Sequence, residues 1–144
     1  MAKYGVTRSN TALSTTNDLL TLITATARKG KIYMIEVDGM GTVSAANEVI
    51  VARSSGGVTA GGAIAPEPIE RDIPATASMT TATTWATQPT LDDILMRMGV
   101  NANGGINRWV APQGKEIEIR NAETLSFRSG LGTSPVSITV HFDE

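Results

Sequence analysis

The sequence predicts an all-β protein: a single antiparallel β sandwich of about eight strands, with an extended N-terminal arm. The C-terminal residues give the clearest evidence, because apolar side chains alternate with polar ones from Val136 to Phe142. A period of two is typical of a strand with one buried face. The charged fraction is only 18%, and the 14 glycines and 6 prolines are spread along the chain, as many turns require.

The length of 144 residues predicts one folded domain. Residues 1–17 are polar, weakly patterned and rich in Thr, Ser and Asn, so we expect an N-terminal arm there and the folded domain over residues 18–144. One interpretation of the arm is a frayed terminus. The other is a segment that becomes ordered against a neighbouring subunit, where residues 7–16 would add a strand to that subunit's sheet.

The first half of the chain has three stretches with a strand pattern: residues 18–27, 31–38 and 47–53. In the first, the leucines also fit a helix, but the Thr content and Gly30 favour a strand. In the second, we expect Tyr33, Ile35 and Val37 to share one face. The basic stretch that separates these two, residues 28–31, is expected to be a solvated turn.

Residues 54–68 are rich in Gly, Ser, Ala and Pro, which predicts a loop across one end of the sandwich that continues as an extended segment through residues 67–74. Residues 101–105 predict the strongest turn, since Asn and Gly tolerate positive φ. Strand patterns occupy the second half at residues 91–100, 106–110, 115–120, 125–128 and 136–144. A short helix remains an alternative for the first of these. Spacing of about ten residues fits a sandwich or barrel.

Composition excludes several classes of protein. The net charge of −2 gives no basic face for nucleic acid. No stretch is apolar for the 18 or more residues that a membrane helix needs, and the N-terminal residues lack the apolar core of a signal peptide. With no cysteine, the chain has no disulfide, thiolate metal site or cysteine nucleophile. We therefore expect synthesis in the cytoplasm, and neither nucleic acid nor membrane as a partner.

Few residues offer catalytic chemistry. His141 is the single histidine and falls on the outward face of the last strand, without a second histidine for a metal site. No Gly-x-Ser-x-Gly elbow surrounds any serine. Asp92 and Asp93 could bind a hard cation, but placement at the N-terminal end of a helix or strand explains them better. Glu116 and Glu118 could flank a sugar as acid and base, but solvation or protection of an exposed strand edge explains them better. We therefore expect no enzyme: no catalytic residue, no cofactor and no metal.

The two tryptophans, Trp85 and Trp109, are open to three interpretations. Core packing of both indoles is the simplest. One of them could instead anchor a protein interface, where Trp is enriched. A carbohydrate-binding face would also use exposed aromatic rings, although the chain has only two Trp, two Tyr and two Phe. The Gly39-Met40-Gly41 stretch lacks the third glycine and acidic partner of a dinucleotide site.

Six stretches carry a resemblance to a known family: residues 31–39, 51–53, 65–68, 107–112, 116–119 and 136–144. In this order they resemble small jelly-roll structural proteins of tailed bacteriophages, including cyanophages, that decorate or cement the capsid. The resemblance covers about residues 28–144 and rests on strands and turns.

The resemblance implies a jelly-roll domain that acts as a virion structural protein on the outer surface of the phage head. Its partners would be the major capsid protein and further copies of itself, with a trimer favoured over a dimer. It would be made in the host cytoplasm. The alternatives are a phage fibre or tail module with the same domain, and a carbohydrate-binding jelly roll.

Overall fold

The computed structural model describes residues 1–72 and 76–144, and these residues form thirteen strands and no helix. The all-β prediction is confirmed. The strands of the first half are β1 (Lys3–Ala12), β2 (Leu20–Ile23), β3 (Lys29–Met40), β4 (Ala46–Ser55), β5 (Val58–Gly61) and β6 (Glu67–Pro68). Those of the second half are β7 (Thr80–Ala82), β8 (Thr84–Thr87), β9 (Thr90–Asn101), β10 (Asn103–Val110), β11 (Ile117–Arg120), β12 (Thr124–Leu131) and β13 (Pro135–Asp143).

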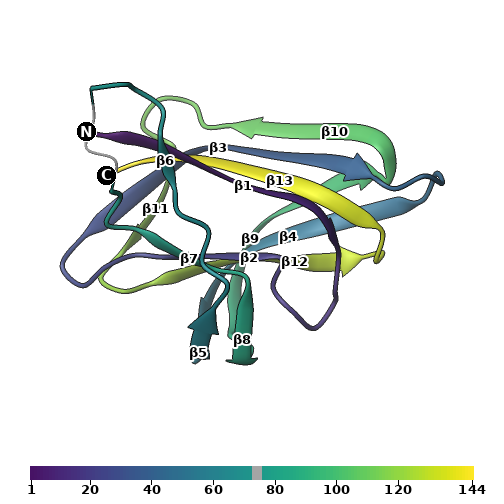
Figure 1. The fold of residues 1–144 in the computed structure, drawn as a ribbon, viewed down its shortest axis with the longest axis horizontal. Coiled ribbons are helices and arrows are strands. Elements are labelled where there is room, and N and C mark those ends of the chain that lie inside the picture. Colours follow the sequence, from purple (N-terminus) through teal and green to yellow (C-terminus); the bar gives the residue numbers. More distant parts are fainter. Residues whose placement is uncertain (73–75) are drawn as a thin grey trace.

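Two antiparallel sheets face each other (Figure 1). The first has the order β10-β3-β13-β1-β6, with β11 also paired to β3, and the second has the order β7-β2-β12-β4-β9. Eight strands form the two facing layers, four in each: β10, β3, β13 and β1 in one, and β2, β12, β4 and β9 in the other. The chain crosses repeatedly between the two sheets. This order is that of a jelly roll, in which long connections place the last strand between the first and third. We call the two layers sheet A and sheet B.

The core lies between the sheets, and β13 shows how the sequence builds it. Its inward side chains Val136, Ile138, Val140 and Phe142 are fully buried, while the residues between them are half-buried. β13 pairs with β1 on one side and β3 on the other, so this strand lies in the middle of sheet A. The alternation predicted from the sequence is therefore confirmed.

A β-bulge in β3 overturns one expected face. His141 pairs with Met34 and Phe142 with Ile32, so Tyr33 is the extra residue on its strand. Because a bulge shifts the alternation by one, Ile32 and Ile35 are both buried, whereas Tyr33 is only half-buried. The prediction that Tyr33 shares the face of Ile35 and Val37 is wrong.

The expected N-terminal arm is a strand of the domain, and that prediction is corrected. β1 pairs with β13 along residues 3–12, and Tyr4 and Val6 are buried in the core. Its other side meets the short strand β6 at Tyr4 and Gly5. Both sides of β1 are therefore paired at Tyr4 and Gly5, and from Thr7 to Ala12 the strand pairs with β13.

Residues 54–68 are more regular than the predicted loop. They contain β5, which pairs with β8 in a small separate sheet, and β6, which runs beside β1. Figure 1 shows β5 and β8 projecting from sheet B, beyond β2 and β7. Of the expected extended segment 67–74, residues 73 and 74 lie outside the described residues. Residues 91–100 form a strand, as predicted, and the turn at residues 101–105 is reduced to a corner at the buried Ala102 between β9 and β10.

Candidate functional site

His141 lies on the outer face of sheet A, as predicted. Its ring is half-buried, with its centroid 6.0 Å from that of Tyr33. Burial lowers the pKa of His141, while the nearby Glu36 carboxylate acts in the opposite direction. Arg108 forms an ion pair with Glu36, so the histidine neighbours a pair that is already neutralised.

The two glutamates considered as an acid and base pair each have a partner of their own. Glu116 accepts a hydrogen bond from the Gly114 amide at 3.1 Å, and amide hydrogen bonds from its own backbone and from Gly114 lower the pKa of its carboxyl group. Glu118 forms an ion pair with Arg120 at 2.5 Å. No group of three or more His, Cys, Asp or Glu among the described residues could hold a metal ion.

A buried polar network on the outer face of sheet B was not predicted. The Asp18 carboxylate accepts hydrogen bonds from Thr21 Oγ1 at 2.7 Å, Ser126 Oγ at 2.5 Å and Arg128 Nε at 2.7 Å. Its side chain is completely buried, and Arg128 compensates its charge. The hydroxyls of Ser126 and Ser54 also share a hydrogen bond of 2.7 Å. Such a connected network fixes the positions of its members, because each one satisfies another.

Trp85 is attached to this network. Its indole Nε1 donates a hydrogen bond to Thr21 Oγ1 at 3.0 Å, which fixes the ring on β8. Gly57 packs against the ring: a Cβ there would lie 2.7 Å from a ring carbon of Trp85 and 2.9 Å from Pro89. Only glycine lets the backbone come this close. Trp85 is half-buried, so neither full core packing nor full exposure describes it.

The Trp85 ring lines a cavity of about 530 Å³, which we call the Trp85 pocket. It lies where β4 ends and β9 and β12 begin, and it also includes Arg53, Asp92, Asp93, Asn121 and Glu123. The structure thus brings together Trp85 and the Asp92–Asp93 pair, which the sequence analysis treated as unrelated. Trp85 lies on β8, which pairs with β5, and the two aspartates lie on β9, which pairs with β4, so the proximity depends on how two different sheets meet.

The Trp85 pocket has unequal charges. Arg53 pairs with Glu123 at 3.1 Å and also donates to the Glu118 carbonyl at 2.9 Å, so its charge is already compensated. Asp92 and Asp93 are exposed, and in the described part of the chain neither forms an ion pair. The pocket therefore carries an excess of carboxylate.

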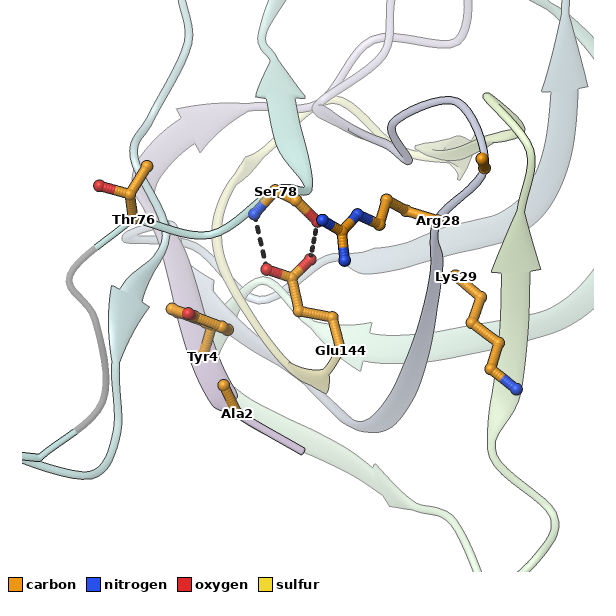
Figure 2. Close-up of a pocket in the computed structure, with 8 residues that line it drawn as sticks. Ala2, Tyr4, Arg28, Lys29, Thr76, Ser78 and Glu144 are labelled. Carbon is orange, nitrogen blue, oxygen red and sulfur yellow. Dashed lines mark hydrogen bonds between the residues drawn. The ribbon is translucent and has the colours of Figure 1, made fainter.

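A second cavity, of about 440 Å³, lies beside the predicted basic turn (Figure 2). The Glu144 carboxylate accepts hydrogen bonds there from the Ser78 amide at 2.6 Å, from Ser78 Oγ at 2.7 Å and from the Met79 amide at 3.0 Å. Figure 2 shows the Arg28 side chain reaching toward Ser78 and Lys29 pointing away. Both cations are exposed. The prediction of a turn at residues 28–31 is wrong in its bounds, because residues 29–31 belong to β3 and pair with β11.

The third candidate is a surface along β9 and β10, the strands that end the two sheet orders on one side of the sandwich. Ile106 and Val110 on β10 are 71% and 59% exposed, and Ile94 and Leu95 on β9 are 47% and 38% exposed. We call these four residues the β9–β10 surface. Trp109, on the opposite face of β10, packs against the core, which confirms the core interpretation for this tryptophan.

In the described part of the chain there is no helix that could cross a membrane. No protein-family model, curated protein or solved structure matches the chain.

Proposed function

We propose that this chain is a virion structural protein, which decorates or cements a phage head by binding major capsid subunits and further copies of itself. Two lines of reasoning support the proposal. One is the resemblance of residues 28–144 to small jelly-roll capsid proteins. The other is the β9–β10 surface, which carries the proposal on the structural side.

The β9–β10 surface has the character of an interface. β9 and β10 are long strands of 12 and 8 residues, and no further strand pairs with their outer edges among the described residues. Exposed edges of this kind are usually protected by charge or by a covering segment. Here β10 presents the exposed Ile106 and Val110 on either side of Arg108. A few residues that become fully buried carry most of the binding energy in protein interfaces, and Arg is enriched among them.

The sandwich suits a cementing role because it is rigid. A core enclosed by eight strands holds the two edge strands in fixed positions, so little conformational entropy is lost on binding. On a capsid lattice each oligomer contacts several shell subunits. Multivalent contact of this kind raises apparent affinity without a strong single contact. A trimer suits positions around local threefold axes, and we favour it over a dimer.

The double variant Ile106→Asp/Val110→Asp tests the proposal. We expect the wild-type chain to form oligomers in analytical ultracentrifugation and to co-sediment with shells of its cognate major capsid protein. The double variant should have at least a tenfold weaker affinity for shells, because burying the new carboxylates at the contact costs desolvation free energy. Its thermal midpoint should be unchanged, since both residues are exposed.

The matched control is Val58→Asp/Ile69→Asp, which adds the same charges at residues that are 53% and 47% exposed elsewhere on the molecule. This control should bind shells as the wild type does. If both double variants bind equally well, the β9–β10 surface is not the interface. If the wild-type chain stays monomeric and does not bind shells, the virion role itself is wrong.

A further inference from the structure

The Trp85 pocket has a construction that the proposed virion role does not require. Trp85, Asp92, Asp93, Arg53 and Asn121 come from four different segments of the chain and face one cavity of about 530 Å³. This volume is within the range of roughly 300 to 1,000 Å³ typical of small-ligand sites. The pocket thus combines an aromatic ring with donors and acceptors in a concave site.

The wall of the pocket is preformed. The ring of Trp85 is fixed by its hydrogen bond to Thr21, which is itself held by the buried Asp18 carboxylate. Thr124 and Ser54, also in the lining, share a hydrogen bond of 2.7 Å between their hydroxyls. A ligand that enters would meet side chains already ordered by other bonds, so little entropy is lost in arranging them.

Another part of the lining is a tight turn between β11 and β12. Asn121 and Ala122 both have positive φ, of 56° and 65°, and the Glu123 amide donates to the Arg120 carbonyl at 3.0 Å. Positive φ at both central residues is the geometry of a type I′ turn. The turn supplies Asn121, Ala122 and Glu123 to the lining, to which β9 supplies Asp92 and Asp93.

We propose that the Trp85 pocket binds a neutral saccharide. A pyranose ring has an apolar C–H face, which packs on an aromatic ring, and a rim of hydroxyls, which both donate and accept hydrogen bonds. Trp85 supplies the ring, Asp92 and Asp93 supply acceptors, and Arg53 and Asn121 supply donors. Sialylated and sulfated sugars fit less well, because their anionic oxygens, like the carboxylates of Asp92 and Asp93, only accept hydrogen bonds. The inference does not rest on the proposed virion role.

A cationic ligand is the main competitor, because it would also satisfy an aromatic ring and two carboxylates. The exposure of Asp92 and Asp93 argues against it. Attraction between exposed charges is largely screened by solvent and salt. Hydrogen bonds to sugar hydroxyls and contact with the indole depend much less on net charge, so the same residues favour a saccharide.

The experiment uses the full chain carrying Trp109→Phe, so that Trp85 is the only tryptophan that emits. Maltotriose, cellotriose, lactose, mannobiose and N,N′-diacetylchitobiose are titrated while Trp85 emission is recorded, and trilysine and sialyllactose are titrated in parallel. We expect a saturable change with at least one neutral sugar and a response at least tenfold weaker to the other two probes. Calorimetry on the wild-type chain, which keeps Trp109, gives the affinity.

Two variants tie the binding to the pocket. Trp85→Ala and Asp92→Asn/Asp93→Asn should each weaken the sugar affinity at least tenfold by calorimetry. The second variant changes only exposed residues, so it should keep the wild-type thermal midpoint. Glu116→Gln/Glu118→Gln, outside the pocket, is the control and should bind normally. The proposal is overturned if no neutral sugar of the panel binds, if trilysine binds in their place, or if Asp92→Asn/Asp93→Asn binds sugar like the wild type.

Discussion

At the scale of single residues, Asp18 has the largest predicted role in stability. Asp18→Ala removes a fully buried carboxylate that accepts hydrogen bonds from Thr21, Ser126 and Arg128. The Arg128 guanidinium would remain, largely buried and without its counter-charge. We expect a loss of about 3 kcal/mol in the free energy of unfolding, measured by urea denaturation.

The control for this prediction is an ion pair at the surface. Arg97 pairs with Glu48 at 2.7 Å, and their side chains are 51% and 28% exposed. Solvent screens such a pair, so Arg97→Ala should cost less than about 1 kcal/mol. Equal losses for the two variants would show that the Asp18 network does not hold sheet B together.

His141 gives a prediction on pH dependence. Burial lowers the pKa of this histidine below its usual 6.5, so the unfolded chain binds the proton more readily than the folded chain. The stability contributed by neutral His141 is complete above pH 6.5 and is lost as the pH falls from there toward the folded-state pKa. We therefore expect the wild type to lose unfolding free energy relative to His141→Gln when the pH is lowered from 7.5 to 5.5.

Comparison with the variant is needed because other groups titrate as well. Burial raises the pKa of Asp38 and of Asp143, and raised carboxyl pKa values stabilise the fold as the pH falls. These terms are the same in both chains and cancel in the difference. A difference that stays constant across the range, or changes in the opposite direction, would contradict the placement of His141.

The residues that could be predicted are those whose role depends on their own strand. His141 was placed on the outer face by counting along β13. For Trp109, core packing was the simplest of three interpretations, and its ring does pack against the core. Asp18 could not be assigned, because its partners Ser126 and Arg128 lie about 110 positions away. The pairing of Trp85 with Asp92 and Asp93 likewise depends on a turn between β8 and β9 and not on any local pattern.

At the scale of elements, β1 is the longest strand that sequence reasoning missed. Only Tyr4 and Val6 are buried among its early residues, and the Thr, Ser and Asn that follow give a weak alternation. β13 is recognisable on its own because four consecutive inward positions are apolar. The difference is physical: β1 is held mainly by backbone pairing to β13, which leaves no mark on side-chain composition.

Val6→Ala tests whether β1 is part of the domain. Val6 is 3% exposed, so its truncation leaves a cavity in the core, and we expect a loss of about 2 kcal/mol in unfolding free energy. Ser9→Ala, on an exposed position of the same strand, should stay within about 0.5 kcal/mol of the wild type. Equal and small effects would be the result expected of an arm and would contradict the strand assignment.

The bulge at Tyr33 shows another limit at this scale. The sequence of β3 reads as regular alternation from Lys31 to Asp38, and only the pairing with His141 and Phe142 reveals the extra residue. β9 has comparable irregularities opposite Val51 and Ala52, which leave Leu95 without a partner in β4. A bulge depends on the pairing of two strands. When side chains are assigned to faces from the sequence of one strand alone, the assignment is therefore correct only as far as the bulge.

At the scale of the whole molecule, the class of fold followed from strand spacing and turn composition, and the strand order of the sheets required the structure. The jelly roll brings β9 and β10 to one side of the sandwich, and with them the apolar residues of the β9–β10 surface. Ile94 and Ile106 alone looked like ordinary strand residues. Their exposure together at the two outer strands is what directs the proposal toward an assembly role.

The most direct test of that role is a cryo-electron microscopy reconstruction of the virus particle that carries this chain. The account predicts a jelly-roll density on the outer surface of the head, with Ile106 and Val110 against a capsid subunit or another copy of the chain. A reconstruction that places the domain on the tail, or on the head with these two residues facing solvent, would contradict it.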